Sequence, residues 1–204
     1  METQEKILKT ALELFFKFGI RHVTMDEIAR ELGMSKKTIY QFYKEKDDLV
    51  NQLLEAELLD QECGFNELSE RASDAIHEIL LISERMREMM QNINPIFFLD
   101  LQKFYPSGFA RFQRFKEECG YQNVLRNLKK GVEQGLYRED LDIELASRYR
   151  MAQLDMLMFG NYFSFERHSI ARISDELLHI FMYGITTLKG HRLINHYKKI
   201  KDVE

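Results

Sequence analysis

The chain has 204 residues, of which 45% are hydrophobic and 30% charged, with only two prolines and ten glycines. This composition excludes a disordered polymer, and the scarcity of helix-breaking residues favours an all-α protein. The sequence lacks a run of about 20 apolar residues, and its N-terminus is acidic, so we expect neither a membrane span nor a signal peptide. Two isolated cysteines, Cys63 and Cys119, indicate a reducing compartment. We therefore predict a cytoplasmic protein.

The net charge of -4 argues against a nucleic-acid partner only if charge is spread evenly over the surface. It is not spread evenly. Residues 1–47 hold nine Lys or Arg against eight Asp or Glu, and the remainder holds 20 against 25. Within residues 36–46, four lysines meet only Glu45. This local excess of positive charge marks a candidate nucleic-acid contact.

Three short helices are predicted before residue 47. The first has apolar residues at helical spacing and ends at Gly19; these residues are Ile7, Leu8, Ala11, Leu12, Phe15 and Phe18. The second begins with a capping box, in which the Thr24 hydroxyl accepts from a backbone N–H and Glu27 reaches back. Ser35 caps the third helix, two residues after Gly33. The spacing is that of a helix-turn-helix.

The steric requirements of a helix-turn-helix are also met. Ala29 is small enough for two helices to cross closely, and Gly33 tolerates the positive φ of the turn. Apolar residues fall where a shared core needs them, at Ile28, Leu32, Met34, Ile39 and Phe42. An ordinary helical hairpin is the alternative, and it does not require all of these positions at once.

The stretch from Thr24 to Leu49, TMDEIARELGMSKKTIYQFYKEKDDL, resembles the N-terminal module of the tetracycline-repressor-like (TetR) family of bacterial regulators. In that family a tyrosine, an aromatic pair after the recognition helix and a lysine opening the fourth helix form a recurrent signature. Here these residues are Tyr40, Phe42-Tyr43 and Lys46. The resemblance implies a DNA-binding head followed by a helical domain that dimerises and binds a small effector.

The residues expected to contact DNA are Thr24, Ser35, Lys36, Lys37, Thr38, Tyr40, Tyr43 and Lys46. Lysine and hydroxyl side chains suit base edges or phosphates. The alternatives are a solvated basic face for the lysines, packing of the ring alone for the tyrosines, Tyr43 above all, and simple capping for Thr24. A cation at Lys46 opposes the helix dipole, so we hypothesise that it contacts a phosphate.

About nine helices are predicted in all, in a head of residues 1–47 and a larger domain of residues 48–204. Helix four is expected to join the two without a flexible linker. The later helices are expected near 73–92, 95–104, 107–134, 142–165 and 173–193. Gly135 should end the helix before it, and Asp142 should cap the helix after it.

The last two predicted helices are apolar on more than one side, which is typical of a subunit interface. In the resembled family they form a four-helix dimer interface, so we expect a homodimer that reads a palindrome. Aromatic and methionine residues suit an apolar effector pocket; the candidates are Phe98, Phe104, Phe109, Phe112, Asp155, Met156, Phe159 and Tyr162. Core packing explains each of them equally well. Asp155 and Asn161 are polar insertions that would orient a ligand, lie in solvent or pair across the interface.

The predicted function is a DNA-binding transcriptional regulator, a repressor released from its operator by a small hydrophobic effector. Catalytic motifs and metal-ligand spacings are absent from the sequence, so we expect no enzyme, no metal and no cofactor. The alternatives are a helical partner-binding protein that does not bind DNA and a regulator that needs no effector. The operator, the regulated genes, the effector and the sign of regulation are not encoded in any motif.

Overall fold

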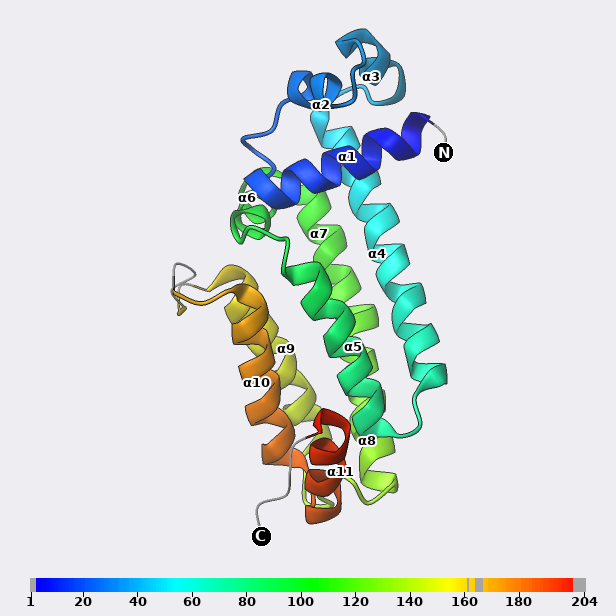
Figure 1. The fold of residues 1–204 in the computed structure, drawn as a ribbon, viewed down its shortest axis with the longest axis vertical. Coiled ribbons are helices and arrows are strands. Elements are labelled where there is room, and N and C mark those ends of the chain that lie inside the picture. Colours follow the sequence, from blue (N-terminus) through cyan, green and yellow to red (C-terminus); the bar gives the residue numbers. More distant parts are fainter. Residues whose placement is uncertain (1–2, 161, 164–166, 200–204) are drawn as a thin grey trace. The chain divides into compact units, whose positions relative to one another are not determined.

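The computed structural model describes residues 3–160, 162–163 and 167–199, and it is built from helices (Figure 1). The helices of the described chain are α1 Thr3–Phe18, α2 Met25–Glu31, α3 Lys36–Phe42, α4 Lys46–Arg71, α5 Ala75–Met90, α6 Ile96–Phe104, α7 Pro106–Phe115, the π-helical segment η1 Lys116–Tyr121, α8 Gln122–Glu133, α9 Ile143–Phe159, α10 Ile170–Ile185 and α11 Leu188–Lys198. The all-α prediction is confirmed. In the part of the chain that the structure describes, no helix is long and apolar enough to cross a membrane.

The chain divides into two compact units. The first unit is residues 1–61 and 92–115, and the second is residues 62–91 and 116–204. Helix α4 runs unbroken for 26 residues, from the first unit into the second. The predicted fourth helix thus continues past residue 61 without a break.

The core of the first unit follows the predicted spacing in most places. Helix α1 buries Ile7, Ala11 and Phe15, one turn apart, and Gly19 ends it with φ +83°. Phe18, expected on the same stripe, is 47% exposed.

The end of α3 departs from prediction. Phe42, expected inside, is exposed, and Tyr43 is fully buried in its place. The helix ends at Phe42, and the extended backbone at Tyr43 (φ −131°, ψ 118°) rotates the next side chain inward. One residue of extended chain thus reverses which ring enters the core.

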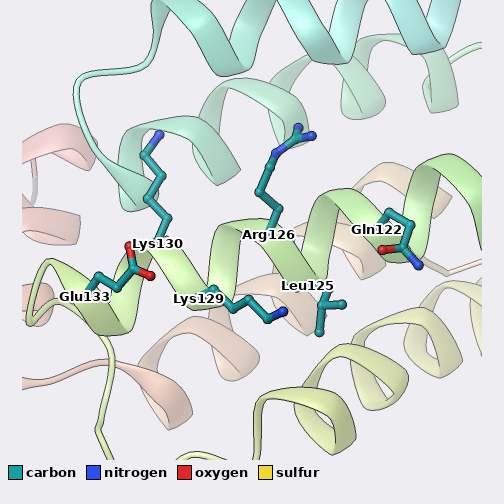
Figure 2. Close-up of a pocket in the computed structure, with 6 residues that line it drawn as sticks. All are labelled: Gln122, Leu125, Arg126, Lys129, Lys130 and Glu133. Carbon is teal, nitrogen blue, oxygen red and sulfur yellow. The ribbon is translucent and has the colours of Figure 1, made fainter.

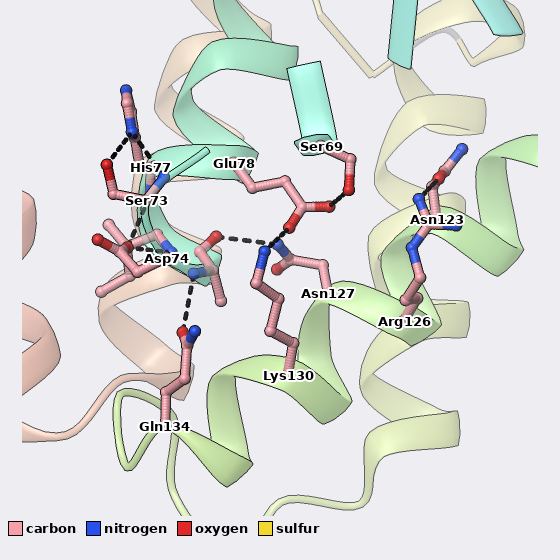
Figure 3. Close-up of polar contacts among 12 residues, drawn as sticks. Ser69, Ser73, Asp74, His77, Glu78, Asn123, Arg126, Asn127, Lys130 and Gln134 are labelled. Carbon is pink, nitrogen blue, oxygen red and sulfur yellow. Dashed lines mark hydrogen bonds and ion pairs between the residues drawn. The ribbon is translucent and has the colours of Figure 1, made fainter. Parts of the chain in front are cut away.

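The second unit is built around a core to which α5, α8, α9, α10 and α11 all contribute. A buried polar network holds the start of α5 against α8 (Figure 3). Glu78 is 1% exposed and accepts from Ser69 Oγ at 2.9 Å and from Lys130 Nζ at 2.8 Å. Asn127 Nδ2 donates to the Ala75 carbonyl at 2.9 Å. The buried carboxylate therefore has a cation and a hydroxyl to compensate it.

The predicted helix over 107–134 is continuous, but it contains a π-helical turn, η1, between α7 and α8. Gly135 ends α8 with φ +66°, and Asp142 caps α9 by accepting from Leu145 N at 3.0 Å, both as predicted. Helix α9 ends at Phe159 rather than near 165, with Gly160 as its cap. Asn161 and residues 164–166 lie outside the described residues.

The single helix predicted over 173–193 is wrong. Thr186 is extended (φ −86°, ψ 152°), and Thr187 starts a new helix by accepting from Gly190 N at 3.2 Å. The backbone N–H of Thr187 also donates to the Leu136 carbonyl at 3.0 Å. If the unbroken α7, η1 and α8 are counted as one helix, this break makes ten helices in the described chain, against about nine predicted.

Candidate nucleic-acid interface

Helices α2 and α3 form a helix-turn-helix whose turns are fixed by local hydrogen bonds. Thr24 Oγ1 accepts from Glu27 N at 3.2 Å, and a Glu27 carboxylate oxygen accepts from Thr24 N at 2.7 Å, which completes the predicted capping box. The Thr24 hydrogen bonds lower the pKa of Glu27. Gly33 has φ +63°, and Ala29 is buried where the helices cross. The capping box, Ala29 and Gly33, from which the turn is predicted, therefore also set its geometry in the structure.

Helix α3 begins at a side-chain cap. Ser35 Oγ accepts from Thr38 N at 3.2 Å and lies 2.8 Å from the Thr38 hydroxyl. Ile39 is buried against the rest of the head, while Lys37 and Tyr40 are exposed. Helix α3 is thus fixed by its cap and by the buried Ile39, and the Lys37 and Tyr40 side chains lie on its exposed face.

Lys36 is already paired within the head. Its Nζ lies 2.9 Å from Asp26 Oδ1 on α2 and 5.8 Å from the centre of the Tyr40 ring. The hydrogen bond and the charge of Asp26 raise the pKa of Lys36. Both side chains of the ion pair are more than half exposed, so the pair is weak enough to exchange for another anion.

Tyr43 is fully buried, and desolvation raises the pKa of its phenol. A buried phenol is not available to a phosphate on the outside of the head. The structure therefore favours the packing alternative for this residue.

Lys46 opens α4 as predicted, but its ammonium turns toward the protein. It donates to the Ile20 carbonyl and, at 3.5 Å, to that of Arg21, and it lies 5.7 Å from the Phe15 ring centre. Burial lowers its pKa, which the nearby charge of Asp100 partly offsets. The Ile20 and Arg21 carbonyl oxygens thus accept the hydrogen bonds that a phosphate was expected to accept from Lys46.

Sequence reasoning missed a residue that holds the head in place. Asp100 on α6 is 5% exposed and accepts from Arg21 N at 2.8 Å. The two residues are 79 positions apart, and no periodicity in the sequence links them. Gln41 and Lys44 are two further exposed polar residues beside the predicted contacts, and neither belongs to the predicted set.

The eight predicted effector residues are divided between the two units. Phe98, Phe104, Phe109 and Phe112 lie in the first unit, and Asp155, Met156, Phe159 and Tyr162 lie in the second. In the first unit Phe98 and Phe112 are buried, with ring centres 6.0 Å apart, whereas the Phe104 ring is partly exposed beneath Arg21.

In the second unit the predicted residues gather around a cation. Lys116 forms an ion pair with Asp155 and lies 5.8 Å from the centre of the Phe159 ring. Met156 is half-buried, but Tyr162 is 72% exposed. Asp155 therefore has a partner inside its own unit, so neither a ligand nor a second subunit is required to neutralise it.

A pocket of about 360 Å³ lies along one face of α8 (Figure 2). Its lining comes from this helix alone and consists of Gln122, Leu125, Arg126, Lys129, Lys130 and Glu133. None of these is a predicted effector residue, and no ring lines it. In the described ranges, no group of three or more His, Cys, Asp or Glu side chains is placed to hold a metal ion.

Comparison with known proteins identifies the head. The family model described as "Bacterial regulatory proteins, tetR family" matches residues 7–53, which run from α1 into α4. The fatty acid metabolism regulator protein of Bacillus subtilis (strain 168) is 24% identical over 184 residues, covering 88% of this chain and 94% of that protein.

Two solved structures share the fold over nearly their whole length. A TetR family regulator from Agrobacterium tumefaciens has a TM-score of 0.75 at 17% identity, covering 90% of this chain and 97% of that one. FadR from Bacillus subtilis, solved in complex with stearoyl-CoA, has a TM-score of 0.69 at 18% identity, covering 89% and 98%.

The matched segment contains the capped turn and the exposed face of α3, and the family model and the relatives reported above are all transcriptional regulators. Residues 7–53 are therefore the head of a TetR-family transcriptional regulator.

Proposed function

We propose that the chain is a homodimeric repressor that binds a palindromic operator in double-stranded DNA and leaves it when a small apolar effector binds. Residues 1–47 read the DNA, and residues 48–204 bind the effector and form the dimer. Such a protein acts in the cytoplasm, where bacterial DNA lies.

The observation that carries this proposal is the outward face of α3. Lys36, Lys37 and Tyr40 stand exposed on a helix whose start is fixed by Ser35. Lysines reach phosphates or guanine edges in the major groove, and a tyrosine hydroxyl reaches phosphates. Thr24, Ser35 and Thr38 complete the proposed contact set, because exposed helix N-termini favour phosphate.

An exposed apolar face on the second unit supports the dimer. On α9, Leu145 and Tyr149 lie one turn apart and are 67% and 53% exposed. On α10, Ile180 is 65% exposed, and a Cβ at Gly184, one turn later, would meet nothing within 4 Å. The Tyr149 ring centre lies 6.2 Å from that of Phe181, the neighbour of Ile180, so the two exposed stretches adjoin, and adjoining apolar side chains on a surface mark an interaction site. Two-fold pairing through this face would present two copies of α3 for adjacent major grooves, about 34 Å apart.

The effector class is taken from the relatives. A fatty acid metabolism regulator and a regulator solved with stearoyl-CoA are both similar to this chain over most of its length. Fatty acyl compounds are therefore the first class to test. An effector releases the operator only to the extent that it binds the released conformation more tightly.

The DNA-binding proposal is tested by selecting bound duplexes from a random pool and measuring affinity against salt. We expect a palindromic site whose affinity falls steeply with salt, and a slope that decreases by about 0.9 for each lysine–phosphate contact removed, as in Lys37→Met. Absence of salt-sensitive binding to any selected duplex would overturn the proposal.

The dimer is tested by sedimentation of Ile180→Glu, which we expect to yield monomers with weakened operator binding. The matched control is Leu59→Glu, because Leu59 is a 60% exposed leucine of the first unit, outside the proposed face. If the Ile180 variant sediments like the wild type, the face assigned to the dimer is wrong.

A further inference from the structure

Helix α9 places a buried arginine on its inward face. Arg150 is 8% exposed, and Gln153, one turn on, is 2% exposed. They share a stripe with Ala146 and Leu157, which are also buried, whereas Leu145 and Tyr149 mark the exposed side of the same helix. The guanidinium therefore faces the interior of its own unit rather than the proposed dimer partner.

Arg150 differs from the other buried charged side chains of the described residues in what surrounds it. Glu78 has Lys130 and Ser69 as partners, and Asp100 accepts from Arg21 N. Arg150 Nη1 donates only to the neutral Gln153 Oε1, at 3.1 Å, and its Cζ lies 6.0 Å from the Phe181 ring centre.

Among the described residues no carboxylate lies within ion-pairing distance of Arg150. Desolvation lowers its pKa to about 10, so the side chain is still charged at neutral pH. An arginine buried without a counter-ion is destabilising, because the guanidinium loses its hydration and gains no charged partner in exchange. Buried, perturbed charges of this kind are found preferentially at functional sites, where a ligand of opposite charge compensates them.

A second donor at the same place lacks an acceptor. The Gln153 amide oxygen is held by Arg150, and the Nε2 of that amide is buried without a hydrogen-bond partner in the described chain. Buried polar groups are nearly always paired, so an unpaired N–H beside an uncompensated cation points to an acceptor that carries negative charge.

We propose that Arg150 and Gln153 bind the carboxylate of an aliphatic carboxylic acid, with the guanidinium and the amide N–H donating to its oxygens. One carboxylate neutralises one guanidinium, whereas a dianionic phosphate would leave a buried negative charge. The Phe181 ring, whose centre lies 6.0 Å from Arg150 Cζ, provides apolar surface beside the guanidinium for the rest of the molecule. This assignment rests on the proposed effector function and names the chemical group that the effector presents.

The experiment uses the full-length protein and three probes: dodecanoate below its micelle concentration, dodecanol and inorganic phosphate. Binding is measured by calorimetry and by the shift in thermal unfolding. We expect dodecanoate to bind and stabilise the wild type, and Arg150→Met to weaken that binding at least about tenfold. Dodecanol should bind the wild type and the variant equally, and Arg150→Lys should recover part of the loss.

The matched control is Arg148→Met, two residues along the same helix, where the arginine is exposed and paired with Glu117 at 2.7 Å. It should bind dodecanoate like the wild type. Because removal of an uncompensated buried charge is neutral or stabilising, Arg150→Met should fold and unfold at an equal or higher temperature without ligand. Gln153→Leu, which removes the unpaired amide, provides the same binding test if Arg150→Met does not fold.

The proposal is overturned if dodecanoate does not bind the wild type, if it binds Arg150→Met equally well, or if phosphate binds in its place. Operator binding without ligand is measured on the same preparations. If the wild type does not bind any operator, the proposed function is refuted. Carboxylate binding at Arg150 is decided separately, by the calorimetry and the thermal shift with dodecanoate.

Discussion

Replacing Lys46 with methionine separates two roles that this residue can have in a DNA-binding head. Its ammonium donates to the Ile20 and Arg21 carbonyls, so we expect it to fasten the connection between α1 and α2 to the start of α4. On that basis Lys46→Met should destabilise the fold and leave the salt dependence of operator binding unchanged.

The magnitude follows from the contacts. Hydrogen bonds from a charged donor contribute about 1.5–3 kcal/mol, and a cation near a partly exposed ring adds about 0.5–1 kcal/mol. Because the Lys46 side chain is only half-buried and methionine keeps its apolar stem, we expect a loss of about 1–2 kcal/mol. In a chain of this length that lowers the melting temperature by about 2–8 °C.

The assay pairs thermal unfolding, followed by circular dichroism, with operator affinity measured over a range of salt concentrations. Lys37→Met provides the opposite pattern, an unchanged melting temperature and a slope lower by about 0.9. Lys44→Met, at an exposed lysine near the head of α4, controls for loss of charge alone. If Lys46→Met lowers the slope by about 0.9 and leaves the melting temperature unchanged, the inward role is wrong and a phosphate contact is right.

Three further predictions concern the same unit. Asp26→Asn frees Lys36 from its ion pair and removes an anion from beside the DNA, so operator affinity should rise by about two- to tenfold at low salt, and the gain should shrink as salt is added. Gly19→Ala combines a positive φ with a Cβ that would lie 2.6 Å from an α6 side chain, so a urea titration should show a loss of about 2–5 kcal/mol in the free energy of unfolding. Gly33→Ala has a similar φ but open space around the new Cβ, so it should lose only about 1–2 kcal/mol. Equal losses would contradict the packing argument. Tyr43→Phe removes only a buried hydroxyl, so the salt slope should not change, and a decrease of about 0.9 would restore the phosphate contact.

The helix-turn-helix was predictable because its determinants are local. A capping box, a turn glycine and a small residue at the crossing act within a few positions of one another, and all three occupy the predicted places. Ile28 and Ile39 are buried as the spacing required. Short-range hydrogen bonds and excluded volume are sufficient to specify this turn.

The side chains at the ends of these helices were less predictable, because their direction depends on backbone turns and on distant partners. Phe42 and Tyr43 exchange places at one extended residue. Lys46 finds its acceptors 25 and 26 positions earlier in the chain. Sequence periodicity identifies the residue types of such a site but not which of them faces outward.

In the second unit the errors have the same origin. The Thr186–Thr187 break leaves little trace in the apolar pattern, which continues through it, and only the capping threonine marks a new helix start. Arg150 gave no signal either, since an arginine on a helix is ordinarily solvated, and only its burial distinguishes it. The predicted effector residues were grouped by type, and the fold divides that group between two units.

Helix α6 lies outside the head of residues 1–47 in the sequence, but it contacts and supports the head. Asp100, in the middle of α6, accepts from the Arg21 backbone N–H, and the backbone N–H of Asn94, just before α6, donates to the Phe16 carbonyl at 2.7 Å. Helix α6 and the residues before it are thus tied to the end of α1 and the turn after it. The Phe16 and Phe97 rings meet edge to face, 5.0 Å apart, between these two bonds. Because α1 packs against α2 and α2 packs against α3, a shift of α6 alters the support of α3 without touching its outward face. Substitutions on α6 should therefore change operator affinity uniformly across sequences, whereas substitutions on α3 change which sequence is preferred.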